Sequence, residues 1–343
     1  MQLFKFSNPK KENVMKKFIK TLIILLVTLC VFTSCSKKGD AKTSEKKEST
    51  KSLRFVTGGE SGTYYAFGSV LAQHATNNTP YRITGLVGAG SRGNVLEIQD
   101  RSADLGFCQT DVLAYAYNGT NLFAKDGKVD CIRTVAALYP EPVQVISVNP
   151  QIKSIADLKG KRVSIGSAGS GVYFNAMDFL NAYGMTEKDI LPTYQSFGDS
   201  ASDLKDGKID AAFIVAGAPT TAVVDLSTTR KVNIISIDDE HINELVKKSP
   251  FYSKYTIPAS VYKTESDITT LAVGAVVVAH EKISDDAIYA FTKDMFDNPS
   301  ALANTHAKYN ELNLEYATSV TTVPYHPGAA KYFAEKGYKV ETK

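Results

Sequence analysis

Residues 54–69 read RFVTGGESGTYYAFGS, and this stretch decides the fold class. An apolar segment typical of a β-strand leads into a turn of glycine, serine and threonine, and paired tyrosines then open a helical pattern. The first N–H groups of a helix have no partner within the helix and carry a partial positive charge. Such a turn therefore favours a small anionic group, which glycines allow to approach the backbone closely.

The same alternation continues along the chain and is typical of α/β proteins with mainly parallel sheets. We expect strands at residues 53–57, 81–87, 104–109, 162–167 and 210–216. We expect helices at residues 65–75, 94–101, 173–184 and 327–338.

A weak internal repeat indicates two similarly built lobes. Residues 61–65 (SGTYY) match 170–174 (SGVYF), and 100–107 (DRSADLGF) match 206–213 (DGKIDAAF). Position 170 follows position 61 by 109 residues, and 210 follows 104 by 106, so nearly one shift fits both pairs. Ligands of open α/β sheets bind at the carboxyl ends of strands, and two lobes would place two such edges across a cleft.

The first 34 residues are of a different kind. Six lysines flank or precede the apolar run TLIILLVTLCVFT, which is shorter than the roughly 20 residues of a membrane-spanning helix. The run predicts a secretory signal peptide, with a retained membrane anchor as the alternative. VFTSC at residues 31–35 resembles the box before the acylated cysteine of bacterial lipoproteins, although Phe32 is unusual there. Cys35 is the expected lipidation site, Met15 a second candidate start, and residues 35–52 a flexible tether.

The charge of the body gives no support for a nucleic-acid partner. The whole chain has 39 basic and 36 acidic residues, but the body from Leu53 has 27 basic and 32 acidic residues. Cys108 and Cys131 remain in the body and either pair or pack as core thiols. The histidines and cysteines show no metal-ligand spacing, so we expect neither a metal nor a cofactor.

Enzyme motifs fit poorly. Neither glycine-rich turn supplies the lysine of a P-loop, and the turn at 166–171 (GSAGSG) lacks the serine position of a hydrolase elbow. Residues 88–93 (GAGSRG) match GxGxxG, with Asp111 near the distance of a ribose-binding acid. An exported protein meets little dinucleotide, however, and the helix from Asn94 to Arg101 is short for that fold.

Several side chains keep two interpretations. Asp111 is either a helix cap or a carboxylate that binds a ligand ammonium group. Arg92 is either a surface residue or a partner for a ligand carboxylate. Tyr64, Tyr65 and Tyr173 are either core residues or part of the site.

Ordered motifs from about residue 53 to 339 resemble the TAXI family of substrate-binding proteins, which serve tripartite ATP-independent periplasmic (TRAP) transporters. The motifs are TGGESGTYYAFG, GSRGN, LGFCQTD, LYPEPVQV, IGSAGSGV, AGAPT, YTIPASVY and HPGAAKYFAEKG. The resemblance implies a two-lobed α/β clamshell of the periplasmic-binding-protein type and no catalysis. Lobe 1 would comprise residues 53–142 and 256–343, and lobe 2 residues 143–255, with hinges near 139–143 and 255–260.

The resemblance also implies an extracytoplasmic receptor for a small carboxylate solute, an amino acid such as glutamate or a dicarboxylate, which is delivered to an ion-gradient-driven TRAP permease. The two anion-favouring helix N-termini together with the Asp111 carboxylate favour a glutamate-like amino acid over a plain dicarboxylate. A lipoprotein sensor that signals to a membrane partner is the alternative. Carried over by position or taken from the patterns above, the candidate ligand-binding residues are Gly62, Thr63, Tyr64, Ser91, Arg92, Asn94, Gln109, Asp111, Ser167, Ser170, Gly171 and Pro219. Arg92 is not a motif position of the family, and Cys108 replaces a residue that is usually apolar.

Replacement of Cys35 by serine tests the predicted lipid anchor. Because serine cannot accept the thioether-linked lipid, we expect Cys35→Ser to move the protein from the membrane fraction to the soluble fraction. Fractionation followed by immunoblotting measures this. Unchanged membrane attachment of the variant would contradict the lipoprotein hypothesis.

Overall fold

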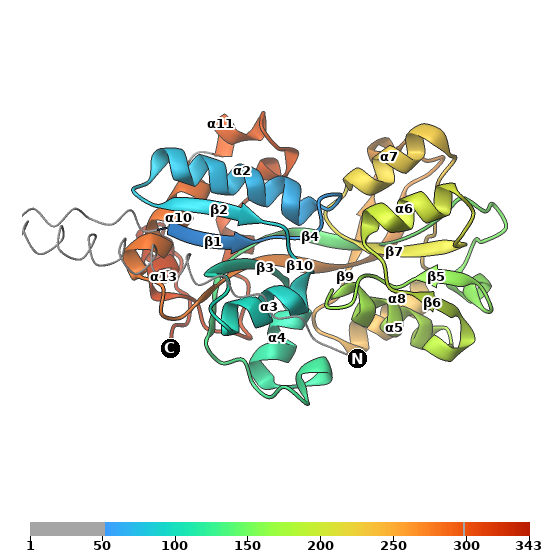
Figure 1. Cartoon of the computed structure of the whole chain (residues 1–343), viewed down its shortest axis with the longest axis horizontal. Coiled ribbons are helices and arrows are strands. Elements are labelled where there is room, and N and C mark those ends of the chain that lie inside the picture. Colours follow the sequence, from blue (N-terminus) through green and yellow to red (C-terminus); the bar gives the residue numbers. More distant parts are fainter. Residues whose placement is uncertain (1–51, 298) are drawn as a thin grey trace, which may run out of the picture. The chain divides into compact units, whose positions relative to one another are not determined.

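The computed structural model describes residues 52–297 and 299–343 (Figure 1). The predicted leader, Cys35 and all of the tether except Ser52 lie outside the described residues. Among the helices of the described ranges, none has the length and apolar character that a bilayer crossing requires.

The described strands form one ten-stranded sheet in the order β2-β1-β3-β10-β4-β7-β5-β6, with β8 beside β4 and β9 beside β10. They are β1 (Ser52–Val56), β2 (Arg82–Leu86), β3 (Leu105–Gln109), β4 (Ile132–Ser147), β5 (Arg162–Ser164), β6 (Leu191–Thr193), β7 (Ala211–Val215), β8 (Asn233–Ile234), β9 (Ser253–Ile257) and β10 (Ile268–His280).

The α-helices are α2 (Thr63–Asn78), α3 (Ser91–Gln99), α4 (Thr110–Asn118), α5 (Val172–Ala182), α6 (Phe197–Lys205), α7 (Thr221–Thr229), α8 (Asp239–Lys248), α9 (Ala259–Tyr262), α10 (Asp285–Asp297), α11 (Pro299–Ala303), α12 (Leu314–Ala317) and α13 (Pro327–Glu335). Short 3₁₀ helices are η1 (Asn121–Phe123), η2 (Ile155–Leu158), η3 (Glu187–Asp189) and η4 (Ala307–Glu311).

The sheet repeats one topology in its two halves. In the first half β1 pairs in parallel with β2 and β3, and β10 runs antiparallel to β3. In the second half β5 pairs in parallel with β6 and β7, and β4 runs antiparallel to β7. The long strands β4 and β10 pair with each other and join the halves. The fold is the expected two-lobed α/β fold, in which each lobe has a mainly parallel sheet flanked by helices.

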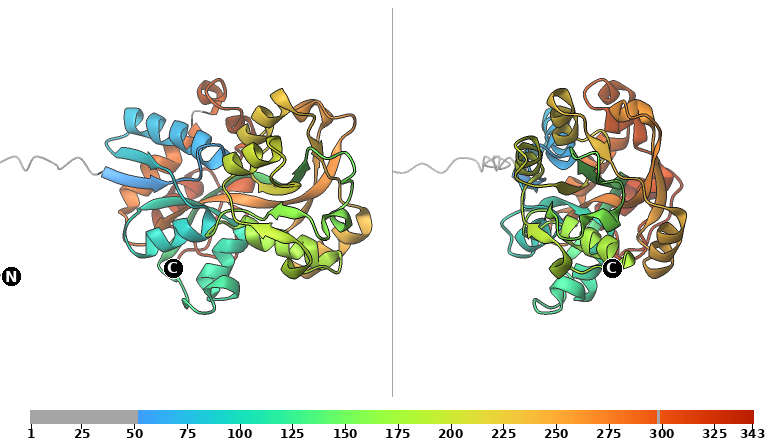
Figure 2. Two further views of the ribbon diagram at one scale, coloured as in Figure 1. Left: turned by 45° about the vertical axis from the view of Figure 1, so that its right-hand side comes forward. Right: turned by 90° about the vertical axis from the view of Figure 1, so that its right-hand side faces the viewer.

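Helices cover both faces of each half. In the first half, α2 and α10 lie on one face, and α3 and α4 on the other (Figure 1). In the second half, α6 and α7 lie opposite α5 and α8, and two further views show the same arrangement (Figure 2). Because successive side chains of a strand point to opposite faces, a strand covered on both sides is apolar throughout. Strand β7 (AAFIV) shows this, since Phe213 packs into one core cluster and Ile214 into the other.

The hydrophobic core changes from one lobe to the other within the two long strands. On β4, Tyr139 packs in the first lobe and Val143 in the second, close to the expected hinge at 139–143. On β10, Val273 packs in the second lobe and Ala275 in the first. Ile257 of β9 packs in a core cluster of the second lobe, and the expected hinge at 255–260 stays a prediction.

The internal repeat corresponds to one arrangement that occurs in both lobes. Asp104, just before β3, accepts hydrogen bonds from the backbone N and Nε of Arg54 at 2.9 and 3.0 Å. Asp210, just before β7, accepts the same two bonds from Arg162, also at 2.9 and 3.0 Å. Each aspartate therefore holds the start of two neighbouring parallel strands together.

Electrostatics favour the ionised form of both aspartates. Burial alone raises the pKa of Asp104, but the hydrogen bonds and charge of Arg54 outweigh burial, so the pKa is lowered. The hydrogen bond from Arg162 is the main reason that the pKa of Asp210 is lowered. A carboxylate with a lowered pKa stabilises the folded state at neutral pH, and this contribution is lost as the pH falls through that pKa.

Removal of these carboxylates tests their importance for the fold. We expect Asp104→Ala to lower the free energy of unfolding by about 1–3 kcal/mol, because the Arg54 N–H loses its acceptor. We expect a smaller loss for Asp210→Ala, because the Asp210 side chain is 23% exposed and that of Asp104 only 8%. Chemical denaturation followed by circular dichroism measures both.

The exposed pair Lys231–Glu265 supplies the control. Glu265→Ala should change the free energy of unfolding by less than about 0.5 kcal/mol. An equally small effect of Asp104→Ala would show that the Arg54–Asp104 contact has no special weight in this fold.

Candidate functional site

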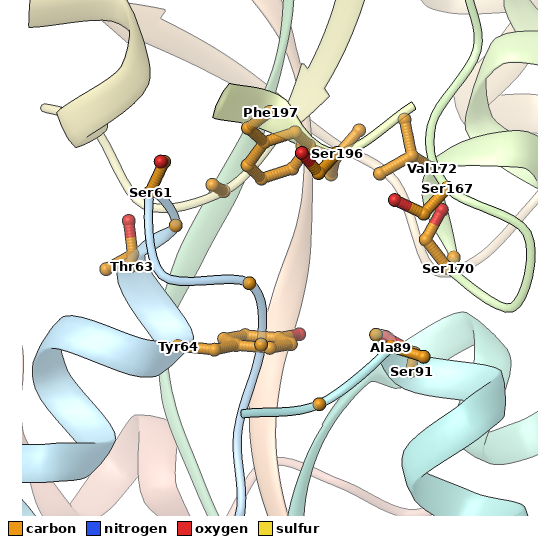
Figure 3. A pocket seen from close by; sticks show the side chains of 18 of the residues that line it. Ser61, Thr63, Tyr64, Ala89, Ser91, Ser167, Ser170, Val172, Ser196 and Phe197 are labelled. Atoms are coloured by element: carbon orange, nitrogen blue, oxygen red, sulfur yellow. The ribbon is translucent and has the colours of Figure 1, made fainter. Parts of the chain in front are cut away.

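A cavity of about 450 Å³ lies where the carboxyl ends of the parallel strands of both lobes face each other. Four strand-to-helix turns form most of its lining: β1–α2 and β2–α3 from the first lobe, and β5–α5 and β6–α6 from the second. Figure 3 shows Ser61, Thr63 and Tyr64 on one side of the cavity and Ser167, Ser170 and Ser196 across from them. The topological repeat thus makes each lobe contribute equivalent turns.

Helix N-termini from both lobes reach the lining. The N-cap residues of α2, α3 and α5 are Gly62, Gly90 and Gly171, and no side chain caps any of these three helices. Helix α6 differs, because the Ser196 side chain accepts a hydrogen bond from the Asp199 N–H. Uncapped N–H groups and aligned peptide dipoles give the cavity partial positive charge from several directions.

The turns of the two lobes lie in direct contact. The Gly93 N–H donates to the Gly169 carbonyl at 3.0 Å across the lobes. A Cβ atom on Gly90 would lie 2.9 Å from Ser170 Cα, and one on Gly171 would lie 1.5 Å from Gln109 Oε1. At Gly90 a side chain would meet the Ser170 backbone, and the positive φ of 100° also favours glycine; at Gly171 it would displace the end of the Gln109 side chain.

Two polar atoms of the lining are buried without a partner among the described residues: Ser170 Oγ and Gln109 Oε1. The hydroxyl of Ser170 is able to donate or accept, whereas an amide oxygen only accepts. A buried polar group without a hydrogen bond is costly, so neither atom is satisfied by the described residues in this arrangement of the lobes.

Charged side chains of the lining are all acidic in the described part of the chain: Glu60, Glu141 and Asp199. Glu141 is 1% exposed, and Tyr64 Oη donates to its Oε2 at 2.6 Å. Burial raises the pKa of Glu141 to about 8, although the Tyr64 hydrogen bond and the Lys308 charge act in the opposite direction. An anionic group in this cavity would therefore depend on backbone N–H groups and hydroxyls.

The structure brings most of the sequence-predicted site residues together. Eight line the cavity: Gly62, Thr63, Tyr64, Ser91, Gln109, Ser167, Ser170 and Gly171. Four do not: Arg92, Asn94, Asp111 and Pro219. Arg92 pairs with Asp126 and lies over the ring of Phe123 at 5.6 Å from its centroid. Asn94 Nδ2 donates to two backbone carbonyls, those of Thr57 and Phe107.

Asp111 is buried in the contact between the lobes. It lies in the first turn of α4, where Oδ1 accepts from the Val112 N–H, and Oδ2 accepts from Asn175 Nδ2 of α5 at 3.1 Å. Burial, the largest effect, raises the pKa of Asp111 to about 6. Asn175 also accepts from Gln109 Nε2, so this amide connects two first-lobe residues to the second lobe.

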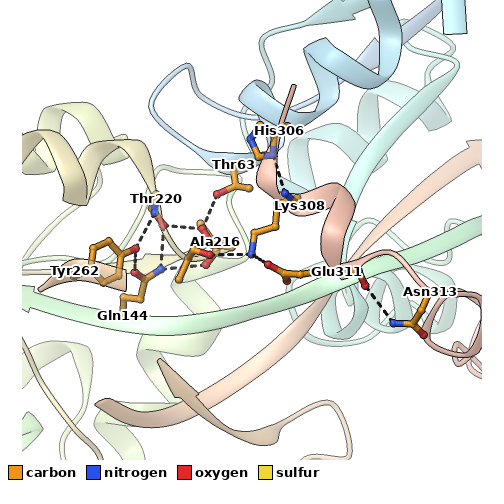
Figure 4. A network of polar contacts seen from close by, with 11 residues as sticks. Thr63, Gln144, Ala216, Thr220, Tyr262, His306, Lys308, Glu311 and Asn313 are labelled. Atoms are coloured by element: carbon orange, nitrogen blue, oxygen red, sulfur yellow. Dashed lines mark hydrogen bonds and ion pairs between the residues drawn. The ribbon is translucent and has the colours of Figure 1, made fainter. Parts of the chain in front are cut away.

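The loop after β7, which contains Pro219, is held from both lobes (Figure 4). Thr63 Oγ1 donates to the Gly217 carbonyl at 2.8 Å, and Lys308 Nζ donates to the Ala218 carbonyl at 2.9 Å. From the second lobe, Gln144 Nε2 donates to the Ala216 carbonyl at 3.0 Å. Pro219 follows a cis peptide bond, and Ala216 of the same segment lines the cavity.

Sequence reasoning missed two parts of the lining. One is the β6–α6 turn with Ser196, Phe197, Gly198 and Asp199. The internal repeat contained the signal, because a shift of 106 residues moves positions 90–93 of the GSRG turn onto 196–199. The other is Glu141, whose signal was a single carboxyl within the apolar stretch LYPEPVQV.

The described residues hold no cluster of three or more histidine, cysteine, aspartate or glutamate side chains suited to a metal ion. Cys108 is buried and Cys131 partly buried, and both thiols are free. Of the two alternatives for this pair, the structure therefore shows separate thiols.

The chain is similar to several solved structures. A protein of Bordetella bronchiseptica RB50 is 16% identical, with a TM-score of 0.51 over 84% of this chain and 83% of that chain. The periplasmic aliphatic sulphonate binding protein SsuA from Escherichia coli is 17% identical, with a TM-score of 0.45 over 84% and 91%. PhnD1 from Prochlorococcus marinus (MIT 9301), solved in complex with methylphosphonate, is 13% identical, with a TM-score of 0.49 over 76% and 88%. A model of the NMT1-like family matches residues 55–337, so the chain belongs to the NMT1-like family.

Proposed function

We propose that the chain is an extracytoplasmic solute receptor that captures a small carboxylate-bearing solute and delivers it to a membrane permease. The observation that carries this proposal is the cavity between the lobes, which the uncapped N-termini of α2, α3 and α5 approach from both sides. A carboxylate that enters it would receive backbone N–H donors from both lobes at once, which favours the closed arrangement.

Binding without catalysis is supported by the chemistry of the lining. The described residues that line the cavity provide serine hydroxyls but no histidine, lysine or cysteine to act as a base or nucleophile beside them. The volume of about 450 Å³ suits a small solute. Anion-favouring turns on both sides and acidic or amide acceptors at the floor together favour a glutamate-like amino acid over a plain dicarboxylate.

The proposed partner is an ion-gradient-driven TRAP permease, and the proposed location is the outer side of a membrane, with Cys35 as the lipid anchor. These statements rest on the TAXI-like motifs and the leader, and the genomic neighbourhood would separate the receptor from a sensor. We also propose that the lobes move about the crossings near Tyr139 on β4 and Val273 on β10, where the core changes from one lobe to the other.

A binding panel tests the receptor function. Native mass spectrometry of the protein as purified would reveal a retained small molecule. Calorimetry would then compare L-amino acids, dicarboxylates, sugars and polyamines. We expect glutamate or another carboxylate solute to bind with a Kd of about 1 μM or lower. Binding of only sugars or polyamines, with no carboxylate solute bound, would contradict the proposal.

Closure between the lobes is tested at Gly171. Its backbone has an ordinary helical conformation (φ −75°, ψ −18°), so alanine brings no backbone strain. The added Cβ would lie 1.5 Å from Gln109 Oε1 and 2.9 Å from Val112 Cγ2, both in the opposite lobe. We expect Gly171→Ala to raise the Kd of the bound carboxylate solute at least about tenfold. Small-angle scattering should show weaker compaction on ligand addition.

Gly85→Ala is the matched control, because its Cβ would meet its nearest neighbours at an ordinary 3.7 Å, within β2 and away from the cavity. The control should bind as the wild type does. If Gly171→Ala also binds and compacts as the wild type does, the contact between the α5 turn and Gln109 is not part of the bound state.

A further inference from the structure

Glu141 lies at the floor of the cavity, where the long strands cross. It belongs to β4, pairs with Val273 of β10, and is one of the residues that line the cavity. Tyr64 fixes its orientation: the tyrosine ring stacks on Phe107 with centroids 4.6 Å apart, and its hydroxyl donates to Glu141 Oε2 at 2.6 Å. This contact occupies one carboxyl oxygen and leaves Oε1 without a hydrogen-bond partner among the described residues.

A second acceptor lines the same cavity. Gln109 Nε2 donates to Asn175 Oδ1 at 3.2 Å, so the amide oxygen Oε1 is the atom without a partner, in a side chain that is 2% exposed. An ammonium group suits the free Glu141 oxygen, because it has three donors and its charge is opposite to that of a carboxylate. A solute carboxylate in its place would offer no donor and would be repelled by an ionised Glu141.

We propose that Glu141 recognises an ammonium group of the solute and gives up its own proton when that group binds. This inference rests on the proposed receptor function and names the class of solute: an amine-bearing carboxylate whose anionic end faces the helix N-termini. The proton passes from the Glu141 carboxyl to solvent, and an ion pair between the Glu141 carboxylate and the solute ammonium replaces the neutral acid. No covalent bond other than that O–H bond changes.

Three side chains from neighbouring elements act on the pKa of Glu141: Tyr64 of α2 and Lys308 of η4 lower it, and Asp111 of α4 raises it. The Glu141 charge in turn raises the pKa of Cys108 of β3, Tyr139 of β4 and Tyr316 of α12. Burial dominates and keeps the acid neutral below about pH 8 in the absence of solute. Lys308 does not neutralise it by contact, since its Nζ is engaged with the Ala218 carbonyl and Glu311.

The sign of the pH dependence follows from the proton balance. A solute that binds the ionised form of Glu141 binds more tightly as the pH rises towards the pKa of the free protein, and affinity changes up to tenfold per pH unit. A dicarboxylate prefers the neutral acid and therefore binds more weakly as the pH rises. With a pKa of about 8, glutamate should bind about fiftyfold more tightly at about pH 8 than at about pH 6.

Calorimetry with glutamate and 2-oxoglutarate between about pH 6 and about pH 8.5 tests the proposal. At about pH 7, glutamate binding should release about 0.9 proton, measured from the heat in phosphate and Tris buffers. Glu141→Gln keeps the shape but cannot ionise. We expect it to weaken glutamate at least about tenfold at about pH 8 and to remove the pH dependence. Binding of 2-oxoglutarate should stay equal or become tighter.

Two further variants assign the titrating group. Tyr64→Phe removes a hydrogen bond that lowers the pKa of Glu141, so the midpoint of the glutamate pH profile should move upwards. Asp111→Asn removes the neighbouring carboxyl, whose own pKa is raised to about 6, and should leave a midpoint near or slightly below about 8. Tyr64→Phe keeps the test informative if Glu141→Gln fails to fold.

The outcomes separate this inference from the receptor function. If neither solute nor any other carboxylate in the panel binds, the proposed function fails. If glutamate binds without proton release and with the same pH profile in the wild type and Glu141→Gln, the receptor function stands and the role of Glu141 is wrong. The role of Glu141 would also be wrong if the pH dependence of glutamate binding disappears in Asp111→Asn but persists in Glu141→Gln.

Discussion

The antiparallel pairing of β4 with β10 is the interaction on which the other features depend. These two long strands run through both lobes, and their register places Tyr139 opposite Ala275 and Glu141 opposite Val273. The core of the first lobe ends within this short stretch, and that of the second begins there. The crossing therefore joins the lobes and places the Glu141 carboxyl among the residues that line the cavity between them.

Because both lobes have the same topology, they contribute equivalent strand-to-helix turns to the lining of the cavity. In each lobe an arginine–aspartate contact joins two parallel strands near their amino ends, away from the cavity: Arg54–Asp104 joins β1 and β3, and Arg162–Asp210 joins β5 and β7. The carboxyl ends of the strands lead into the turns that line the cavity. Since these turns become helix N-termini, two equivalent anion-favouring edges face each other without a single basic side chain among the described residues of the lining.

Local sequence patterns were sufficient for five of the parallel strands, β1, β2, β3, β5 and β7, and for most of the turns, whereas the parallel strand β6 was not anticipated. The expected strand at 104–109 and the observed β3 (Leu105–Gln109) agree closely, because its apolar run is bounded by clear turn residues. The strand expected at 162–167 ends earlier, at Ser164, because Gly166 adopts a positive φ of 88° and begins the turn. The long strands β4 and β10 were not anticipated, since their pairing is between residues more than a hundred positions apart.

The sequence alone could not show which buried carboxyl, Asp111 or Glu141, lines the cavity. Both are carboxyls in apolar surroundings, and the distance along the chain does not tell which one lines a cavity. Asp111 sits at the start of α4, where Val112 and Asn175 take up its oxygens. Glu141 sits on β4 and is one of the residues that line the cavity, and Tyr64 is bonded to only one of its two carboxyl oxygens.

Two kinds of contact would stabilise the closed arrangement of the lobes: hydrogen bonds between the lobes themselves, and contacts with a bound solute. The bonds Asn175–Asp111, Thr63–Gly217 and Gly93–Gly169 join the lobes without any solute, and each contributes on the order of 1 kcal/mol. Such contacts lower the free energy of the closed arrangement relative to the open one, so a smaller binding energy of the solute is sufficient to favour it. We propose that the remaining energy comes from the bound solute, whose anionic end would face the uncapped helix N-termini and whose donors would face Glu141. Under this proposal, selectivity and closure come from the same contacts.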